Sequence, residues 1–303
     1  MQRRLHEPEW RNISAPMSRR KQSPKQNRHD STSRRPREGD SPSRDHRPDR
    51  PAPPKRRQRG GSQGPSQEEN WLYGFHAVLA ALENPARTPK RLLLTKNASA
   101  ELHRQGRAAL PLTPEPASGE EIASLLPPGA VHQGIALHAS PLPDYDLPDA
   151  CEDARCAVIL DQVTDPHNFG AILRSAAVFG ATALVTTARH SPPLGGVLAK
   201  AASGALEKVK IARVPNLARA MEELQELGFE LVGLDGDADA TLPALDLGER
   251  VGLVLGAEGA GLRRLTREHC DLLAKLPASG DMRSLNVSNA AAVALYELFR
   301  RTL

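Results

Sequence analysis

Three short segments combine hydroxyl, amide, carboxylate and guanidinium groups with small residues. They are DQVTDPHNFGAILRS, LVLGAEGAGL and RSLNVSNAA, which begin at Asp161, Leu253 and Arg283. Side chains of these types can orient a polar substrate, stabilise a developing charge or hold an anion. We therefore ask which helices and strands would position the three segments, and whether they would meet.

The first segment follows an apolar run and opens a helical pattern expected over Phe169–Phe179. Asn168 is expected to cap that helix, because a side-chain amide oxygen can accept from a free backbone N–H. Gly170 permits close approach, and Arg174 lies about one and a half turns into the helix. The same residues also fit a plain capped helix with a surface arginine, so this segment alone does not define a site.

The second segment runs from a buried strand into Gly256, Glu258, Gly259 and Gly261. Glycines at such a turn let the backbone approach a ligand. Their spacing is GxxGxG, which differs from the GxGxxG of dinucleotide sites and comes late in the alternating pattern. The carboxylate of Glu258 would also repel a pyrophosphate. The alternative is a tight turn that carries a solvated glutamate.

The third segment precedes an amphipathic helix expected from Leu285 and holds more polar groups than a cap requires. One Ser or Asn is enough for an N-cap, yet Ser284, Asn286, Ser288 and Asn289 are all present. Ser284 is expected at the N-cap, where free N–H groups and the helix dipole favour an anion such as phosphate.

Strand-like apolar runs alternate with helical patterns from Arg155 to the end of the sequence. Near-continuous apolar strands between helices predict an α/β fold with a mostly parallel sheet covered on both faces. In such sheets ligands bind beyond the carboxyl ends of the strands. Each of the first two segments follows an apolar strand run. The third segment follows a loop, and that loop comes after a further apolar strand run. We therefore expect all three at one edge of the sheet.

Composition divides the rest of the chain. Residues 1–70 are expected to be a disordered Pro/Arg-rich arm, because they lack the apolar residues that offset chain entropy. Residues 71–139 are expected to form a small α/β domain, which begins with helical spacing from Leu72 to Leu82 and has a strand from Val131 to His138. Residues 140–154 hold three prolines and are expected to be a linker. Residues 155–303 form the second domain.

The positive charge is concentrated in the arm. Residues 1–70 carry 18 Lys and Arg against 9 Asp and Glu, and because the whole chain is +4, residues 71–303 carry −5. A basic disordered arm favours contact with a polyanion such as RNA, although a solubilising tail has the same composition. No apolar run long enough for a transmembrane helix and no secretory signal is expected. Three cysteines without CxxC spacing argue against disulfides or a zinc site, and a cytosolic protein is expected.

Together and in this order, the three segments resemble the motifs of the SpoU family of RNA methyltransferases, in the SPOUT superfamily. The segments YGFHAVLAAL and HQGIAL are similar to the N-terminal RNA-binding domain of those members that methylate guanosine in 23S rRNA. That domain is similar to a small ribosomal-protein fold. The resemblance covers residues 71–303, and it implies a deep trefoil knot, which the strand pattern does not predict.

The resemblance also implies an activity, 2′-O-methylation of a ribose with S-adenosylmethionine as the methyl donor. It implies a homodimer through the C-terminal domain and requires no metal. The catalytic residues that it implies are Arg174, Asn168, Glu258, Ser284 and Asn286. It further implies that the cofactor is contacted by Thr186, Gly256, Leu276, Leu285 and Asn289.

Arginine has a pKa too high for a general base, so Arg174 is expected to stabilise the developing alkoxide and grip the neighbouring phosphate. Ser284 would hold that phosphate, and Asn168 would orient Arg174 or the ribose. Glu258 would orient Arg174, within one chain or from across the dimer, and Asn286 would brace the loops. His167 is left without a role.

Other functions remain open at this stage. The target could be tRNA, on which a simpler type of the family acts. A non-catalytic RNA-binding or ribosome-assembly protein could keep the same fold, although the intact polar segments argue against it. A nicotinamide-dependent oxidoreductase is disfavoured by the glycine spacing, and an interaction scaffold would leave the three segments unexplained.

Overall fold

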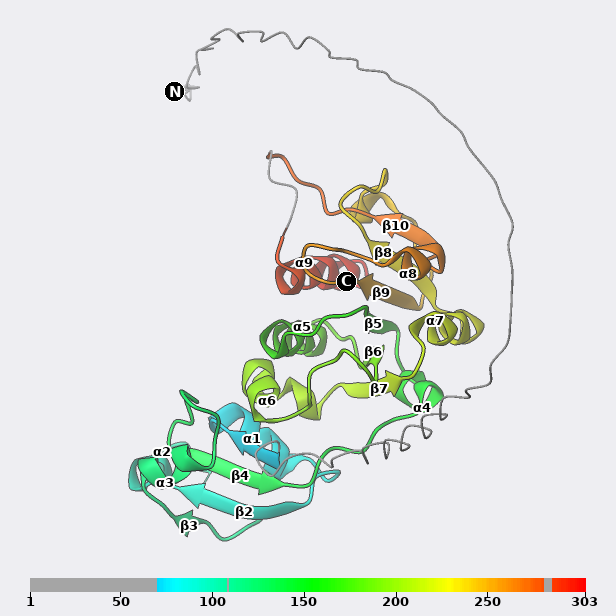
Figure 1. The fold of residues 1–303 in the computed structure, drawn as a ribbon. Helices are drawn as coiled ribbons and strands as arrows, with labels where there is room; N and C mark the ends of the chain where they lie inside the picture. The colour runs from blue at the N-terminus through cyan, green and yellow to red at the C-terminus, as the bar shows by residue number, and fades with distance from the viewer. Residues whose placement is uncertain (1–69, 108, 281–284) are drawn as a thin grey trace, which may run out of the picture. The chain divides into compact units, whose positions relative to one another are not determined.

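The described residues from Cys156 onward form, in the computed structural model, a six-stranded sheet that confirms the predicted parallel α/β fold (Figure 1). Its order is β10-β8-β9-β5-β6-β7, and every pairing is parallel. The strands are β5 (Cys156–Leu160), β6 (Ala183–Thr187), β7 (Lys210–Val214), β8 (Glu230–Leu234), β9 (Val251–Leu255) and β10 (Leu272–Ala274). The structure describes residues 70–107, 109–280 and 285–303.

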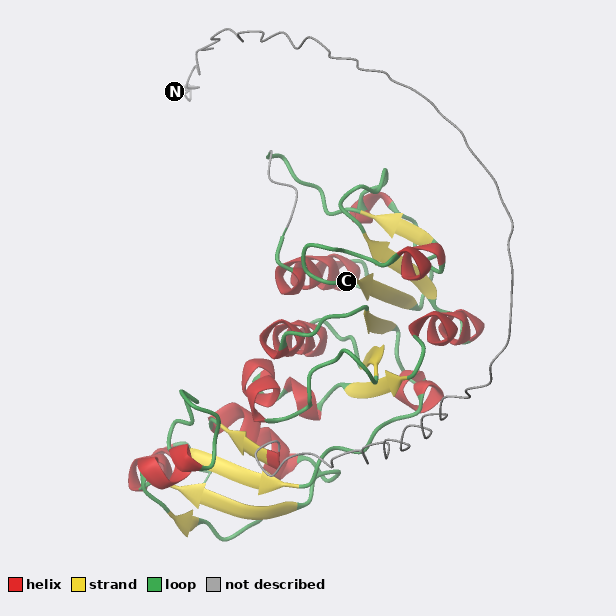
Figure 2. Cartoon of the chain, viewed as in Figure 1, coloured by secondary structure: helices red, strands yellow, loops and turns green. Residues whose placement is uncertain are grey.

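Helices cover both faces of this sheet, as Figure 2 shows. They are α4 (Leu147–Cys151), α5 (Pro166–Val178), α6 (Gly196–Ala202), α7 (Leu217–Glu226), α8 (Arg264–Glu268) and α9 (Val287–Arg300), with the short 3-10 turns η2 (Ala205–Glu207) and η3 (Leu242–Ala244). Side chains of α5, α6 and α9 share one buried cluster with the sheet, and those of α4 and α7 share another. Among the described residues, no helix is long and apolar enough to span a membrane.

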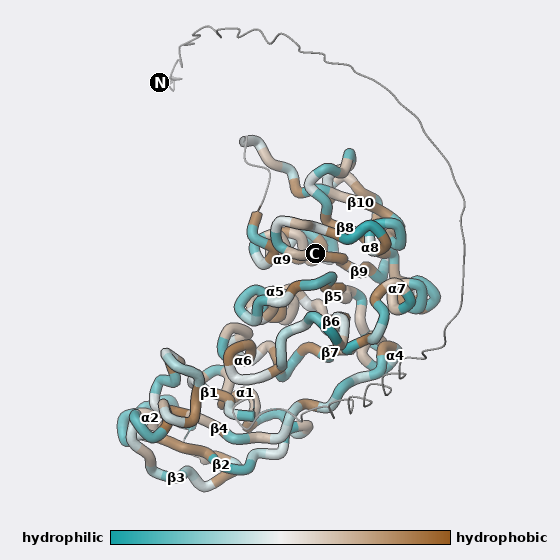
Figure 3. The backbone as a smooth tube through the Cα atoms, viewed as in Figure 1, coloured by the Kyte–Doolittle hydropathy of each residue, from teal (hydrophilic) through white to brown (hydrophobic). Residues whose placement is uncertain are grey.

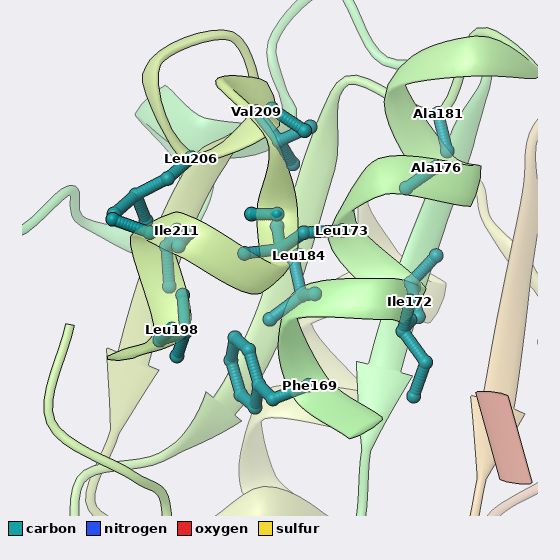
Figure 4. Close-up of a cluster of buried hydrophobic side chains, with 14 of the residues drawn as sticks. Phe169, Ile172, Leu173, Ala176, Ala181, Leu184, Leu198, Leu206, Val209 and Ile211 are labelled. Carbon is teal, nitrogen blue, oxygen red and sulfur yellow. The ribbon is translucent and has the colours of Figure 1, made fainter. Parts of the chain in front are cut away.

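Apolar side chains hold α5 against the sheet. In Figure 4, Phe169 and Leu173 of α5 lie toward Leu184 of β6 and Leu198 of α6, and all four are fully buried. Hydrophobic colour concentrates on the strands in Figure 3, whereas α7 is largely hydrophilic outside its buried stripe. Burial of this kind is what fixes the first turn of α5, and with it the first polar segment, at the sheet edge.

Residues 70–139 form a second, mixed sheet of order β1-β4-β2-β3. In it β4 pairs antiparallel with β1 and β2, and β2 pairs parallel with β3. Its elements are β1 (Trp71–Tyr73), α1 (Phe75–Glu83), β2 (Pro89–Leu94), α2 (Lys96–Arg104), β3 (Glu115–Pro116), α3 (Gly119–Ser124) and β4 (Ile135–Ala139). Helix α4 begins at Leu147, inside the segment of linker-like composition, and its apolar side chains are buried.

Two boundaries in this part differ from the sequence expectation. Helical spacing was expected from Leu72, but Trp71–Tyr73 is a strand and the helix begins after Gly74, whose φ of 85° few other residues adopt. A strand was expected from Val131, but β4 begins at Ile135 because Gln133 and Gly134 both have positive φ. In both cases turn residues with positive φ outweigh the apolar periodicity.

A buried ion pair joins Arg87, which lies between α1 and β2, to Glu207 of η2. The Arg87 guanidinium lies 2.8 Å from the Glu207 carboxylate, and their side chains are only 3% and 4% exposed. Asn84 Nδ2 donates to the same carboxylate at 2.7 Å, and Arg87 Nη1 donates to the Ser140 carbonyl at 2.9 Å. Each charge therefore has hydrogen-bond partners, which a buried ion requires.

Replacing Arg87 with alanine is expected to lower the free energy of unfolding by about 3–5 kcal/mol, because Glu207 would be left buried without its counter-charge. Urea denaturation of the wild type and the variant measures this change.

The matched control is Arg91→Ala, which removes an arginine from the exposed Arg91–Glu115 pair, whose side chains are 51% and 46% exposed. Water screens that pair, so the midpoint should hardly move. An equal loss of unfolding free energy in the two variants would show that the buried ion pair stabilises the fold no more than the exposed one.

Candidate active site

Asn168 lies in the first turn of α5, but it does not cap the helix as predicted. The N-cap is Asp165, whose carboxylate accepts from the backbone N–H groups of His167 and Asn168 at 3.2 Å each. A carboxylate at this position also suits the positive end of the helix dipole. The side-chain amide of Asn168 is consequently available for contacts outside its own helix.

Glu258 lies in the loop that follows β9. Backbone hydrogen bonds in both directions join Ala257 and Gly261 at 3.1 and 2.9 Å, so the loop is a tight turn. A Cβ on Gly256 would stand 2.1 Å from the carbonyl carbon of Gly261, which shows that the turn can close only over glycine. The close approach of the backbone therefore explains the first glycine of the GxxGxG pattern, and no bound pyrophosphate is needed to explain it.

Asn286 caps α9. Its Oδ1 accepts from the backbone N–H of Ser288 at 2.9 Å and from the Ser288 hydroxyl at 2.6 Å. The prediction of Ser284 as the N-cap is therefore wrong, and Ser284 itself lies outside the described residues. The reason is local: the helix starts at Val287, the first residue of the buried stripe, and the cap is the residue immediately before it.

The three predicted polar segments meet through Asn168, Glu258 and Asn286. Asn168 Nδ2 donates to Glu258 Oε2 at 3.1 Å, and Asn286 Nδ2 donates to Asn168 Oδ1 at 3.1 Å and to Glu258 Oε1 at 3.3 Å. Each of the three side chains thus contacts the other two. The resulting polar triad lies at the carboxyl ends of β5 and β9, where the α/β sheet was expected to place a site.

Arg174 lies further along α5, with an exposed side chain. The described residues offer it no hydrogen-bond or ion-pair partner, and Glu258 contacts the two amides of the triad instead. Arg174 follows Asn168 by six positions, so at 3.6 residues per turn the two lie about 120° apart around the helix axis. The expected pairing of Glu258 with Arg174 is therefore not among the contacts within this chain.

The residues expected at the cofactor occupy two strand ends and the start of α9. Thr186, which is 1% exposed, pairs in register with Leu160 of β5, and Leu160 pairs with Leu255, the neighbour of Gly256. Leu276 is half-buried shortly after β10, whereas Leu285 is 54% exposed and Asn289 is exposed in the first turn of α9. The register places Thr186 and Gly256 at the same edge as the polar triad.

A buried carboxylate behind the triad was missed by sequence reasoning. Asp161, fully buried at the end of β5, accepts from Arg263 Nε at 2.7 Å, from the Arg263 backbone N–H at 3.2 Å and from the Thr266 hydroxyl at 2.6 Å. Its own N–H donates to the Leu255 carbonyl at 2.8 Å. It therefore ties the end of β5 to both sides of the loop that carries Glu258. The available signal was an acid directly after the apolar run CAVIL.

The cysteines are poor candidates for chemistry. Burial raises the pKa of Cys151 to about 11 and the pKa values of Cys156 and Cys270 to about 12. All three remain protonated thiols near neutral pH, and the thiolate is the nucleophilic form. Among the described residues, no three His, Cys, Asp or Glu side chains are grouped closely enough to hold a metal ion.

Two family models match this chain over most of its described length. The model described as the SpoU rRNA Methylase family matches residues 155–296, and the model described as RNA 2'-O ribose methyltransferase substrate binding matches residues 71–145. The chain belongs to the SpoU methylase family, which confirms the resemblance drawn from the three segments.

The similarity to curated relatives covers nearly the full length of those relatives. The 23S rRNA (guanosine-2'-O-)-methyltransferase RlmB of Salmonella typhimurium is 42% identical over 243 residues, covering 76% of this chain and 98% of the relative. The protein of the same name from Escherichia coli K12 is 42% identical with the same coverage, and that from Xylella fastidiosa is 38% identical over 253 residues, covering 78% and 99%.

Solved structures share the fold. The SpoU methyltransferase AviRb from Streptomyces viridochromogenes, in complex with the cofactor AdoMet, is 25% identical with a TM-score of 0.64 over 77% of this chain and 89% of AviRb. An RNA 2'-O ribose methyltransferase at 24% identity also gives a TM-score of 0.64, over 78% and 90% of the two chains, which supports the fold alone.

Asp161→Asn is expected to loosen the Glu258 loop, because an amide cannot accept on both sides from the three donors that now surround the carboxylate. We expect a loss of about 1–3 kcal/mol in the free energy of unfolding. We also expect faster hydrogen exchange at the amides of Ala257 and Gly261, with β6 and β7 unchanged.

Asp153→Asn is the matched control, since Asp153 is exposed and precedes β5, at the opposite end of the strand from Asp161. If the amides of Ala257 and Gly261 exchange as slowly in Asp161→Asn as in the wild type, the buried carboxylate does not hold the loop.

Proposed function

We propose that this protein transfers a methyl group from S-adenosylmethionine to the 2′-hydroxyl of a guanosine ribose in 23S rRNA. The observation that carries the proposal is the polar triad of Asn168, Glu258 and Asn286 at the carboxyl edge of the sheet. It occurs in a chain 42% identical to RlmB enzymes whose name states this reaction. Action on 23S rRNA also places the protein in the cytoplasm.

The residues at the edge fit the cofactor. Leu285 exposes more than half of its surface next to Asn286, and Leu276 is half-buried, so apolar surface for an adenine ring adjoins polar groups. We assign Thr186, Gly256, Leu276, Leu285 and Asn289 to cofactor contact. S-adenosylmethionine supplies a sulfonium-activated methyl group whose leaving group departs neutral.

The chain must then align a weakly acidic hydroxyl and manage its charge. Arg174 stabilises the developing alkoxide and holds the neighbouring phosphate, assisted by Ser284. Asn168 orients the ribose, and Glu258 fixes the Asn168 amide by accepting from it, as the 3.1 Å contact permits. Asn286 holds the other two side chains of the triad at the start of α9.

The domain division follows the same proposal. Residues 1–70 are a basic arm that adds affinity for RNA, residues 71–139 bind the substrate, residues 140–154 connect, and residues 155–303 catalyse. The substrate-binding domain has the fold of a small ribosomal protein. The segment from about Leu253 to α9 threads a loop to form a trefoil knot. The sheet order, in which β9 lies between β8 and β5, accommodates this threading.

We further propose that two copies form a homodimer through α5 and α9. An apolar patch lies on these helices: Val178 is 66% exposed, Val293 48% and Tyr296 51%, and the Phe179 ring packs edge-on to Tyr296 with centroids 5.8 Å apart. Arg174 precedes Val178 by four residues and so shares its face of α5. A second copy that covers the patch would therefore bring Arg174 toward the partner's triad.

The proposed activity predicts that the protein, mixed with labelled S-adenosylmethionine and unmodified large-subunit rRNA, produces 2′-O-methylguanosine at one position. Arg174→Ala should lower kcat by about 100- to 1000-fold, the usual loss of a group that stabilises transition-state charge. Nucleoside mapping and single-turnover rates measure both.

The control is Arg219→Ala, which removes an exposed arginine from α7 on the other face of the sheet and should leave the rate unchanged. Label in tRNA alone would favour the tRNA-acting type. No label, together with no cofactor binding, would favour a non-catalytic RNA-binding protein.

Tyr296→Glu is expected to convert the dimer to monomers, because a charge in the centre of an apolar interface is costly to desolvate. Sedimentation velocity measures the change. Arg219→Glu, a charge change on α7, should leave the dimer intact. A wild-type protein that sediments as a monomer would contradict the shared site.

A further inference from the structure

The domain that contains the mixed sheet has a cavity that plays no part in the proposed methyl transfer. The cavity occupies about 680 Å³ and is lined by residues of the end of β2, of helix α2 and of β3, together with Arg107, Leu110 and Pro114. Leu94 and Leu102 are buried in its wall, and Leu110, Pro114 and Pro116 complete the apolar lining. This volume is within the range of sites that bind small organic groups.

The rim of the cavity is polar and positively charged. Lys96, Ser99 and His103 follow one another at spacings of three and four on α2, so they line one face of that helix. Arg107 adds a second permanent positive charge, and the lining contains no carboxylate.

These groups contribute little to the fold. Among the described residues, Lys96 Nζ, the Ser99 hydroxyl and the His103 ring have no hydrogen-bond partner, and Arg107 makes only an exposed ion pair with Glu83 at 3.0 Å. Such a pair is readily exchanged for another anion, because water already screens it. The rim therefore offers donors that a ligand can take without breaking the structure.

Apolar walls beneath a rim of cations match one chemical class well. A nucleobase has flat, weakly polar faces that fit leucine and proline side chains, and its phosphate fits lysine and arginine. Sequence-specific RNA recognition usually targets the unstacked bases of single-stranded segments, which side chains of the protein can surround. The domain around the cavity matches the substrate-binding family model, and a free metabolite would need none of that context.

We propose that this cavity takes one unstacked nucleotide of the RNA substrate, with the base against Leu94 and Leu102 and the phosphate on Lys96 and Arg107. The inference rests on the proposed function, since it names the part of the RNA that the first domain holds. It adds a specificity site apart from the polar triad, at a nucleotide other than the one methylated.

The test fills the cavity without changing its charge. Ser99→Trp should weaken binding of an unmodified 23S rRNA fragment about tenfold or more, the effect of losing one base contact. Binding of S-adenosylmethionine should not change. The matched control is Arg104→Ala, on the same helix, whose side chain is 75% exposed, pairs with Glu101 and does not line the cavity. Fragment affinity equal to the wild type in Ser99→Trp overturns the proposal.

A second variant covers the case in which tryptophan prevents folding. Lys96→Gln should reduce the slope of log affinity against log salt by about one, as expected for the loss of one phosphate contact. An unchanged slope overturns the proposal. Binding of free guanosine monophosphate in the cavity, with RNA affinity untouched by both variants, would make it a small-molecule site and would also overturn it.

The outcomes separate this inference from the activity itself. A wild-type protein that transfers no methyl group but loses RNA affinity on Ser99→Trp keeps the cavity and loses the proposed reaction. A protein that methylates 23S rRNA with the same KM in the wild type and in Ser99→Trp keeps the reaction and loses the cavity.

Discussion

The carboxylate of Asp161 sets the constraint on which the site depends. A buried charge is tolerated only when donors surround it, and here all three come from Arg263 and Thr266 on the far side of the Glu258 loop. The loop therefore has to return to the end of β5 to satisfy the charge. That return places Glu258 over the first turn of α5, where the Asn168 amide is ready to donate.

Helix capping then decides which side chains are free. Asp165 takes the cap of α5, which leaves Asn168 to contact the neighbouring loop. Asn286 combines both tasks, since its oxygen caps α9 while its amide nitrogen donates to Asn168 and Glu258. An amide can do this because it carries an acceptor and two donors on one side chain. Aspartate at 286 would keep the cap and lose the triad.

Sequence reasoning succeeded where burial controls the outcome. The apolar runs fixed the parallel sheet, and the rule that sites lie at the carboxyl ends of strands brought Asn168, Glu258 and Asn286 together correctly. It failed where two polar residues compete for one local role, as Asp165 with Asn168 and Asn286 with Ser284. Propensity does not distinguish such neighbours, because the choice depends on where the first buried side chain falls. Asp161 was missed since its partners lie 102 and 105 residues away.

The separation of the triad along the chain has a consequence for synthesis. Asn168 emerges from the ribosome well before Asn286, which follows it by 118 residues. Strands β5 and β6 can pair early, yet β9 must still enter between β5 and β8, and α9 must dock after that. A partly made chain would hold the first segment in place while it still lacks Glu258 and Asn286. The polar triad is thus completed only late in synthesis, after most of the domain that carries it has been made.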